Sequence, residues 1–303
     1  MKHKVQPLRI ALIEPGVSQL ALALARAGQP VTLIDTDPHD LRRLREMLPR
    51  LAGTAGHLIE LSNDVSAANT ADCVLASCDI GTVCTDWTAS VAMPVLHLAQ
   101  CPRCAPIVEQ IGDDDTGHVA QIAVLLNAYH GVLPSGAIPL SVRFQVALSH
   151  IIEGILMTDL TPAEIDEALE NAGFAIGPFE AQDEIGIDTV LLNRRVVDGL
   201  QQNKALPLFE RAVAEGRLGR KASVGWYRYP GQSGKVEDPL VEDMAFEEAH
   251  FAGHTRRAMK ASEVVERVQT GLDALCAQLS NEGYAHEVIC EIASRSIGHP
   301  VRP

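Results

Sequence analysis

The sequence is poor in aromatic and basic residues, and both shortages narrow the functions open to it. Aromatic residues make up 4% of the 303 residues, too few for the stacking platforms that bind single-stranded nucleic acids. Lysine and arginine number 25 against 39 aspartates and glutamates, so the net charge is −14. Because such a chain repels phosphate backbones and anionic lipids, we expect neither nucleic acid nor a membrane surface as a partner.

Long apolar runs and a disulfide framework are also missing. No stretch of about 18 uninterrupted apolar residues occurs, so the sequence predicts no transmembrane helix. Pro7 and Arg9 break the apolar run that a signal peptide would need. The seven cysteines are odd in number and lack scaffold spacing, which favours free thiols. We therefore expect a soluble, cytoplasmic protein, long enough for two or three domains.

The first part of the chain alternates signals of strands and helices. Apolar runs predict strands at 8–13, 31–35, 73–77 and 94–98. Between the first two strands, apolar residues recur at helical spacing until Gly28. This order predicts a βαβ unit within a Rossmann-type, mostly parallel sheet. We assign this α/β domain to residues 1–140.

Helical patterns dominate after residue 140. Apolar residues recur at helical spacing over 145–157 and 263–279, and Thr161-Pro-Ala-Glu164 has the form of a capping box. The turn-rich stretch 230–234 is typical of a linker, and Asp238-Pro239 then begins another helix.

A faint internal repeat divides this helical part. Glu287-Val-Ile echoes Glu164-Ile-Asp, and Gly298-His-Pro300 echoes Gly173-Phe-Ala. We therefore predict an all-helical domain over 141–232 and a partial second copy of it over 233–303. Whether the second copy completes the domain within the chain or pairs with another subunit is left open.

The turn after the first strand is the usual place for a dinucleotide, yet most glycines of that fingerprint are absent. In Glu14-Pro-Gly-Val-Ser-Gln19 only Gly16 matches, and Glu14 places a negative charge where a diphosphate would lie. Asp35 ends the second strand, where a carboxylate binds both ribose hydroxyls and favours NAD over NADP. Gly16 and Asp35 are the candidate NAD-binding residues. The alternative is that they only form a turn and end a strand.

Two blocks in the middle of the chain carry regularly spaced glycines and aromatic residues. The first is Gly173-Phe-Ala-Ile-Gly-Pro-Phe179 followed by Asp183-Glu-Ile-Gly-Ile-Asp188, and the second is Gly216-Arg-Leu-Gly-Arg-Lys221 followed by Gly225-Trp-Tyr-Arg-Tyr229. Both resemble motifs in the C-terminal domain of the 3-hydroxyacyl-CoA dehydrogenase family. The resemblance covers nearly the whole chain, strongly in the middle and weakly at both ends. It implies NAD-dependent interconversion of 3-hydroxyacyl and 3-oxoacyl groups, and a homodimer formed through the helical domain.

The resemblance also implies a catalytic pair. In this family a histidine in a His-Phe-Phe-Asn-Pro run is the general base, and a glutamate twelve positions later orients it. Val95-Leu-His97 and Ile107-Val-Glu109 hold both residues at the same spacing. An imidazole can take a hydroxyl proton near neutral pH, and a carboxylate on its other ring nitrogen stabilises the imidazolium. His97 and Glu109 are therefore the expected catalytic residues, and a purely structural histidine is the alternative.

The substrate contacts are less well marked. The serine that binds the substrate oxygen in this family aligns with Ser77, with Thr82 as the other possibility. No asparagine near Phe144-Gln145 matches the family's substrate-contacting asparagine. The region between Asp35 and His97 is also shorter than in the family. Two alternative functions therefore stay open: a dehydrogenase of a small hydroxy acid that carries no CoA, and a non-catalytic binding or assembly protein that retains the fold.

Three further groups of residues allow both a functional and a purely structural interpretation. Cys101-Pro-Arg-Cys104 is a redox pair or half of a zinc site, or two incidental thiols, which we favour. Asp113-Asp-Asp115 resembles a metal loop, but a solvated acidic turn is the favoured interpretation. Arg217 and Lys221 are candidates for an acyl-CoA phosphate or for exposed solubilising charge. We predict no metal site.

Overall fold

The computed structural model describes residues 7–13, 19–35, 38–77, 95–99, 103–199, 207–232, 234–254 and 257–299. The chain divides into two compact units. The first comprises Met1–Ala99 and Pro106–Pro139, and the second comprises Gln100–Ala105 and Leu140–Pro303. The short segment between the two parts of the first unit therefore belongs to the second. Within the described ranges, none of the helices combines the length and the apolar character needed to cross a membrane.

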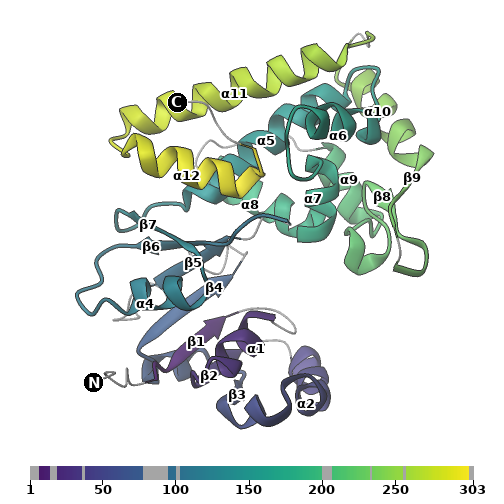
Figure 1. Cartoon of the computed structure of the whole chain (residues 1–303). Helices are drawn as coiled ribbons and strands as arrows, with labels where there is room; N and C mark the ends of the chain where they lie inside the picture. Colours follow the sequence, from purple (N-terminus) through teal and green to yellow (C-terminus); the bar gives the residue numbers. More distant parts are fainter. Residues whose placement is uncertain are drawn as a thin grey trace. The chain divides into compact units, whose positions relative to one another are not determined.

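The first unit is built on a seven-stranded sheet in the order β3-β2-β1-β4-β5-β6-β7 (Figure 1). Its strands are β1 (Ile10–Ile13), β2 (Val31–Ile34), β3 (Ile59–Ser62), β4 (Cys73–Ser77), β5 (Val95–Ala99), β6 (Ile107–Ile111) and β7 (Tyr129–Leu133). Strands β1 to β5 run parallel, β6 is antiparallel to β5, and β7 is parallel to β6. The predicted Rossmann-type, mostly parallel sheet is confirmed.

The strand order reverses at β1, which has β2 on one side and β4 on the other. Open α/β sheets bind their ligands outside the carboxyl ends of the strands at such a point. The helices of this unit are α1 (Gln19–Arg26), α2 (Pro38–Ala52) and α4 (His118–Leu125), with 3-10 segments η1 (Gly53–Leu58) and η2 (Val65–Thr70). Ile10 and Leu12 pack in one apolar cluster with residues of all three helices, whereas Ala11 packs with residues of η2. This alternation covers the sheet on both faces.

The second unit consists mainly of helices. These are α5 (Leu140–Leu156), α6 (Pro162–Asn171), α7 (Pro178–Ile185), α8 (Ile187–Gly199), α9 (Pro207–Ala214), α10 (Pro239–Phe251), α11 (Ala261–Asn281) and α12 (His286–Ile297). The predicted capping box is confirmed, since the Thr161 hydroxyl accepts from the Glu164 N–H and the Glu164 carboxylate accepts from the Thr161 N–H. Helix α5 begins earlier than the expected residue 145, because the buried Leu140, Val142 and Phe144 extend its apolar face.

The stretch 230–234 lies between two paired strands and is not a linker between domains, so this expectation was wrong. It joins β8 (Tyr227–Arg228) to β9 (Val236–Glu237) in an antiparallel hairpin, which the all-helical prediction also omitted. Lys235, just after the turn, donates to Glu180 at 2.8 Å. Asp238 accepts from Arg217 at 2.6 Å. Glycine and proline mark a reversal of the chain equally well in a linker and in a hairpin, and the sequence pattern did not separate the two.

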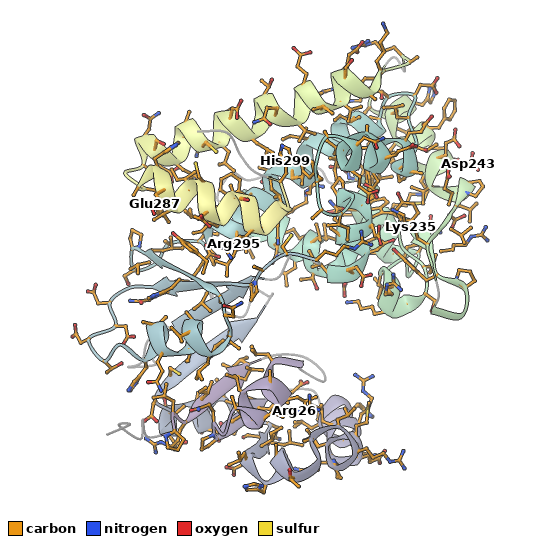
Figure 2. All side chains as sticks on the ribbon, in the orientation of Figure 1. Arg26, Lys235, Asp243, Glu287, Arg295 and His299 are labelled. Carbon is orange, nitrogen blue, oxygen red and sulfur yellow. The ribbon has the colours of Figure 1, made fainter. Side chains whose placement is uncertain are left out.

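The C-terminal helices pack onto the other helices of the second unit. Helices α11 and α12 both pack against α5, and α11 also packs against α6 (Figure 1). The repeated glycine–aromatic pairs meet here. The Phe174 and His299 rings stack with their centroids 4.4 Å apart, and the Gly298 carbonyl accepts from the Ala175 N–H at 2.9 Å. We call Gly173, Phe174, Ala175, Gly298 and His299 the glycine junction; His299 is labelled in Figure 2.

Candidate active site

Strands β5 and β6 bring the expected catalytic pair into register. They run antiparallel, and His97 lies directly opposite Glu109. Directly opposite residues in such a pair have Cβ atoms about 4.5–5.5 Å apart on one face of the sheet. Glu109 is completely buried. The structure describes the backbone of His97 and not its side chain, so the backbone places the two residues together and their side-chain geometry stays a prediction.

The residue expected to bind the substrate lies on the neighbouring strand. Ser77 is the last residue of β4, and β4 pairs with β5 so that Ala76 lies beside His97 and Ser77 beside Leu98. The side chain of Ser77 is not described, and Thr82 lies outside the described residues. Three adjacent strands thus carry Ser77, His97 and Glu109, although long stretches of sequence separate the first from the others.

The position of Asp35 fits the ribose of a dinucleotide. It directly follows β2, is 6% exposed, and extends the ladder to β3 because its N–H donates to the Ser62 carbonyl at 3.0 Å. A carboxylate at the carboxyl end of this strand, one strand from the reversal of strand order, is where the ribose hydroxyls of NAD bind in such sheets. Gly16 lies outside the described residues, as does the rest of its turn from Glu14 to Ser18.

The other candidates are occupied by contacts within the fold. Asp114 accepts from the N–H groups of Thr116, Gly117 and Val119, so this acidic residue shapes the turn before α4. No cluster of three or more metal-ligating side chains occurs in the described part of the chain. Of the two cysteines in the Cys-x-x-Cys motif, Cys101 lies outside the described residues.

The expected phosphate role of Arg217 does not fit its environment. Arg217 is 5% exposed, and it donates to Asp238 at 2.6 Å and to the Gly225 carbonyl at 3.0 Å. Its guanidinium is therefore committed to the fold, and the alternative of exposed solubilising charge is wrong as well. Lys221 is half-exposed and pairs with Asp188 at 2.6 Å. Its exposure agrees with the alternative expectation of a solubilising surface charge.

Two buried carboxylates join the motif blocks, and sequence reasoning assigned neither of them this role. Asp183 accepts hydrogen bonds from the Trp226 N–H, the Tyr227 N–H and the Tyr229 hydroxyl, each at 2.9 Å. Asp166 accepts from the Phe179 and Glu180 N–H groups at the start of α7 and from the Tyr227 hydroxyl. An acidic residue beside Ile165 and Leu169, on the buried face of α6, was the available signal for Asp166. Both carboxylates support the fold of the helical unit.

Burial makes these two carboxylates hold protons at unusually high pH. It raises the pKa of Asp166 to about 7 and that of Asp183 to about 6, although their hydrogen bonds oppose the shift. An unfolded aspartate has a pKa of about 3.9. Between about pH 4 and pH 7 the folded chain therefore binds more protons than the unfolded chain, and the contribution of both groups to the free energy of unfolding falls as pH rises.

Asp166→Asn is expected to flatten this pH dependence. The variant loses one titrating group, so the decline in the free energy of unfolding between about pH 4.5 and 7 should become shallower, by at most about 1.4 kcal/mol per pH unit. Urea unfolding of both proteins at several pH values in this window measures the two slopes. Equal slopes in the two proteins would contradict the shift at Asp166, whatever the difference in absolute stability.

A reversal of strand order and an acidic residue at the end of β2 are typical of sheets that bind a dinucleotide. A comparison with protein families matches the segment that contains the two motif blocks. Residues 143–229 match the model of the 3-hydroxyacyl-CoA dehydrogenase C-terminal domain. Through this segment the chain is related to the 3-hydroxyacyl-CoA dehydrogenase family.

The relatives match only parts of their own length. The peroxisomal bifunctional enzyme of Danio rerio is 31% identical over 146 residues, which are 43% of this chain and 19% of that enzyme. A probable 3-hydroxyacyl-CoA dehydrogenase of Caenorhabditis elegans is 44% identical over 79 residues, 23% of this chain and 26% of that protein. The chain thus spans about a fifth to a quarter of these curated relatives.

Solved structures show the same fold over nearly the whole chain. A 3-hydroxybutyryl-CoA dehydrogenase of Escherichia coli has a TM-score of 0.61 at 14% identity, covering 97% of this chain and 90% of that one. The dehydrogenase part of a C. elegans multifunctional enzyme has a TM-score of 0.59 at 14% identity, covering 97% and 79%. At this identity the likeness shows the fold, namely a Rossmann-type sheet followed by a helical part.

Proposed function

We propose that the protein is an NAD-dependent oxidoreductase that interconverts 3-hydroxyacyl and 3-oxoacyl groups. The observation that carries the proposal is the register of β5 and β6, which sets His97 opposite a fully buried Glu109. A carboxylate without water around it is costly unless a partner stabilises it. A neighbouring imidazole that becomes positively charged during the reaction is such a partner.

In the oxidation direction His97 takes the proton of the substrate hydroxyl. Glu109 fixes the tautomer of the imidazole and stabilises the imidazolium that forms. Ser77 donates a hydrogen bond to the same substrate oxygen. When bound, NAD supplies the acceptor for the hydride that leaves C3. Asp35 would hold its ribose, and the turn at Gly16 would approach its diphosphate.

Cofactor binding and turnover together test this function. Titration with NADH in a calorimeter is expected to give saturable binding, and NADH oxidation is expected with acetoacetyl-CoA. No binding at millimolar NADH would contradict the proposal and would leave the non-catalytic binding or assembly protein. Binding with turnover of free acetoacetate, but not of its thioester, would instead identify a dehydrogenase of a small hydroxy acid without CoA.

Two further expectations remain proposals. The first is a homodimer formed through the helical unit, as the resemblance implies. In the alternative to a homodimer, α11 and α12 of the same chain cover α5, and no helices of another subunit are needed there. The second is a cytoplasmic location, which rests on sequence composition alone.

A further inference from the structure

Helices α11 and α12 form a hairpin in the second unit, and each carries one cysteine. The two helices pack against each other and are joined by the short stretch 282–285, so they run antiparallel (Figure 1). Cys276 lies five residues before the last residue of α11, and Cys290 lies four residues after the first residue of α12. At about 1.5 Å of rise per residue, both cysteines are about 6–8 Å from the turn. They therefore lie at the same level of the hairpin.

Both cysteines belong to the apolar stripes of their helices. On α11, Cys276 lies between the buried Leu272 and Leu279, four residues after the first and three before the second. On α12, Cys290 lies three residues before the buried Ala293. Residues three or four apart share one face of a helix. Both cysteines are half-buried and carry free thiols in this structure, so each keeps a sulfur atom that a small oxidant can reach.

The two thiols also lie close enough to influence each other. Burial, followed by the charges of Cys290 and Asp273, raises the pKa of Cys276 to about 11. Burial and the charge of Glu291 raise the pKa of Cys290 as well. His286 lies one helical turn before Cys290, and its Nε2 is 3.5 Å from the sulfur. A neutral imidazole nitrogen can accept the proton of this thiol, which leaves the thiolate, the reactive form of cysteine.

We propose that Cys276 and Cys290 are a redox-sensitive pair, which hydrogen peroxide oxidises to a disulfide between α11 and α12. The thiolate of Cys290 attacks one peroxide oxygen and the O–O bond breaks, which gives a sulfenic acid and a hydroxide that takes up a proton to become water. The thiolate of Cys276 then attacks the sulfenic sulfur, forms the S–S bond and releases the hydroxyl group as a second water. The two thiols are thus oxidised by two electrons, the peroxide is reduced, and both thiol protons end in water.

The disulfide fastens the hairpin that covers α5. Helices α11 and α12 both pack on α5, and a link from Cys276 to Cys290 restricts the unfolded chain more than the folded one. The oxidised protein is therefore expected to have a midpoint of thermal unfolding about 5–10 °C above that of the reduced protein. The inference concerns the helical unit alone and does not depend on the proposed function.

Peptide mapping of the oxidised full-length protein tests the pair directly. No lysine or arginine lies between 268 and 294, so trypsin releases both cysteines in one peptide, 268–295. After treatment with hydrogen peroxide this peptide is expected to lose the mass of two hydrogen atoms and to regain it on reduction. Further cleavage after Glu282 and Glu287 should give two cysteine-containing fragments that stay joined until the disulfide is reduced.

Three cysteine variants control the mapping. Cys276→Ser and Cys290→Ser are each expected to abolish the disulfide and the rise in the unfolding midpoint. Cys104→Ser is the matched control, because Cys104 is also half-buried in the second unit but lies outside the hairpin; it should form the disulfide to the wild-type extent. Sulfinic or sulfonic acids on both cysteines without a disulfide would overturn the inference. A disulfide that leaves the unfolding midpoint unchanged would contradict the clamping of the hairpin.

The rate of disulfide formation should depend on pH in a way that marks these two thiols. Because the thiolate is the nucleophile and both thiols have raised pKa values, the rate should increase by up to about tenfold per pH unit from pH 7. It should still be increasing above pH 8.5, the ordinary pKa of about 8.5 for a cysteine thiol. Samples quenched with a thiol-alkylating reagent at timed intervals give the rate at each pH. A rate that levels off by pH 8.5 would assign the reaction to exposed thiols and contradict the inference.

Discussion

His97→Ala is expected to lower kcat for acetoacetyl-CoA reduction about 10²- to 10⁴-fold. A positioned general acid or base contributes about this much to a proton transfer, and alanine removes it without replacement. The affinity for NADH should stay within about twofold, because the proposed ribose contact is at Asp35, on a different strand. Stopped-flow measurement of NADH oxidation gives kcat, and calorimetry gives the affinity.

A matched histidine substitution controls for nonspecific loss. His254→Ala removes an exposed imidazole in the helical unit and should retain full activity. The kcat of Glu109→Gln is expected to fall between those of the two alanine variants, since glutamine keeps the shape of the side chain opposite His97 in the strand register and loses the charge proposed to stabilise the imidazolium. Wild-type turnover in His97→Ala would contradict the proposed mechanism.

Asp183→Ala is expected to cost about 3–5 kcal/mol of the free energy of unfolding. The carboxylate accepts from two backbone N–H groups and from the Tyr229 hydroxyl, and a buried donor left without a partner costs about 1–3 kcal/mol. Removing the carboxylate should break the hydrogen bonds between the two motif blocks, because Asp183 lies in the first block and all three donors lie in the second. Urea unfolding followed by tryptophan fluorescence measures it, since the buried Trp226 lies beside this carboxylate.

Asp243→Ala is the control for this substitution. Asp243 is exposed on α10 (Figure 2), and surface substitutions away from specific contacts usually change stability by less than about 0.5 kcal/mol. A loss below about 1 kcal/mol in Asp183→Ala would mean that water or a rearranged loop replaces the carboxylate. The three hydrogen bonds would then not be what holds the blocks together.

The sequence predicted correctly those strands, helix ends and caps that depend on residues close by in the chain. The apolar runs of β1 and β2, the helix that ends before Gly28, and the capping box at Thr161 all depend on neighbours within a few residues in sequence. Here the sequence and the structure agree. The pair His97 and Glu109 was expected from the family resemblance and not from a local pattern, and the antiparallel pairing that sets the two residues opposite each other became visible only in the structure.

Features that depend on distant partners were missed. The roles of Asp166 and Asp183 depend on donors that the fold brings from other parts of the chain. The β8–β9 hairpin looked like a linker because its strands are too short to show alternation. Nothing local marks the ion pair of Arg103 either, since its partner Glu180 comes from α7. Such contacts follow from packing, which a single sequence does not display.

The packing of α11 and α12 on α5 has a consequence for behaviour in dilute solution. Helices on a separate subunit would leave α5 whenever the protein concentration fell below the dissociation constant of the pair. Here the covering helices are tethered to the surface that they cover. Their effective concentration is set by the length of the connecting chain and not by how much protein is present. The shielding of α5 should therefore persist even at nanomolar protein concentration.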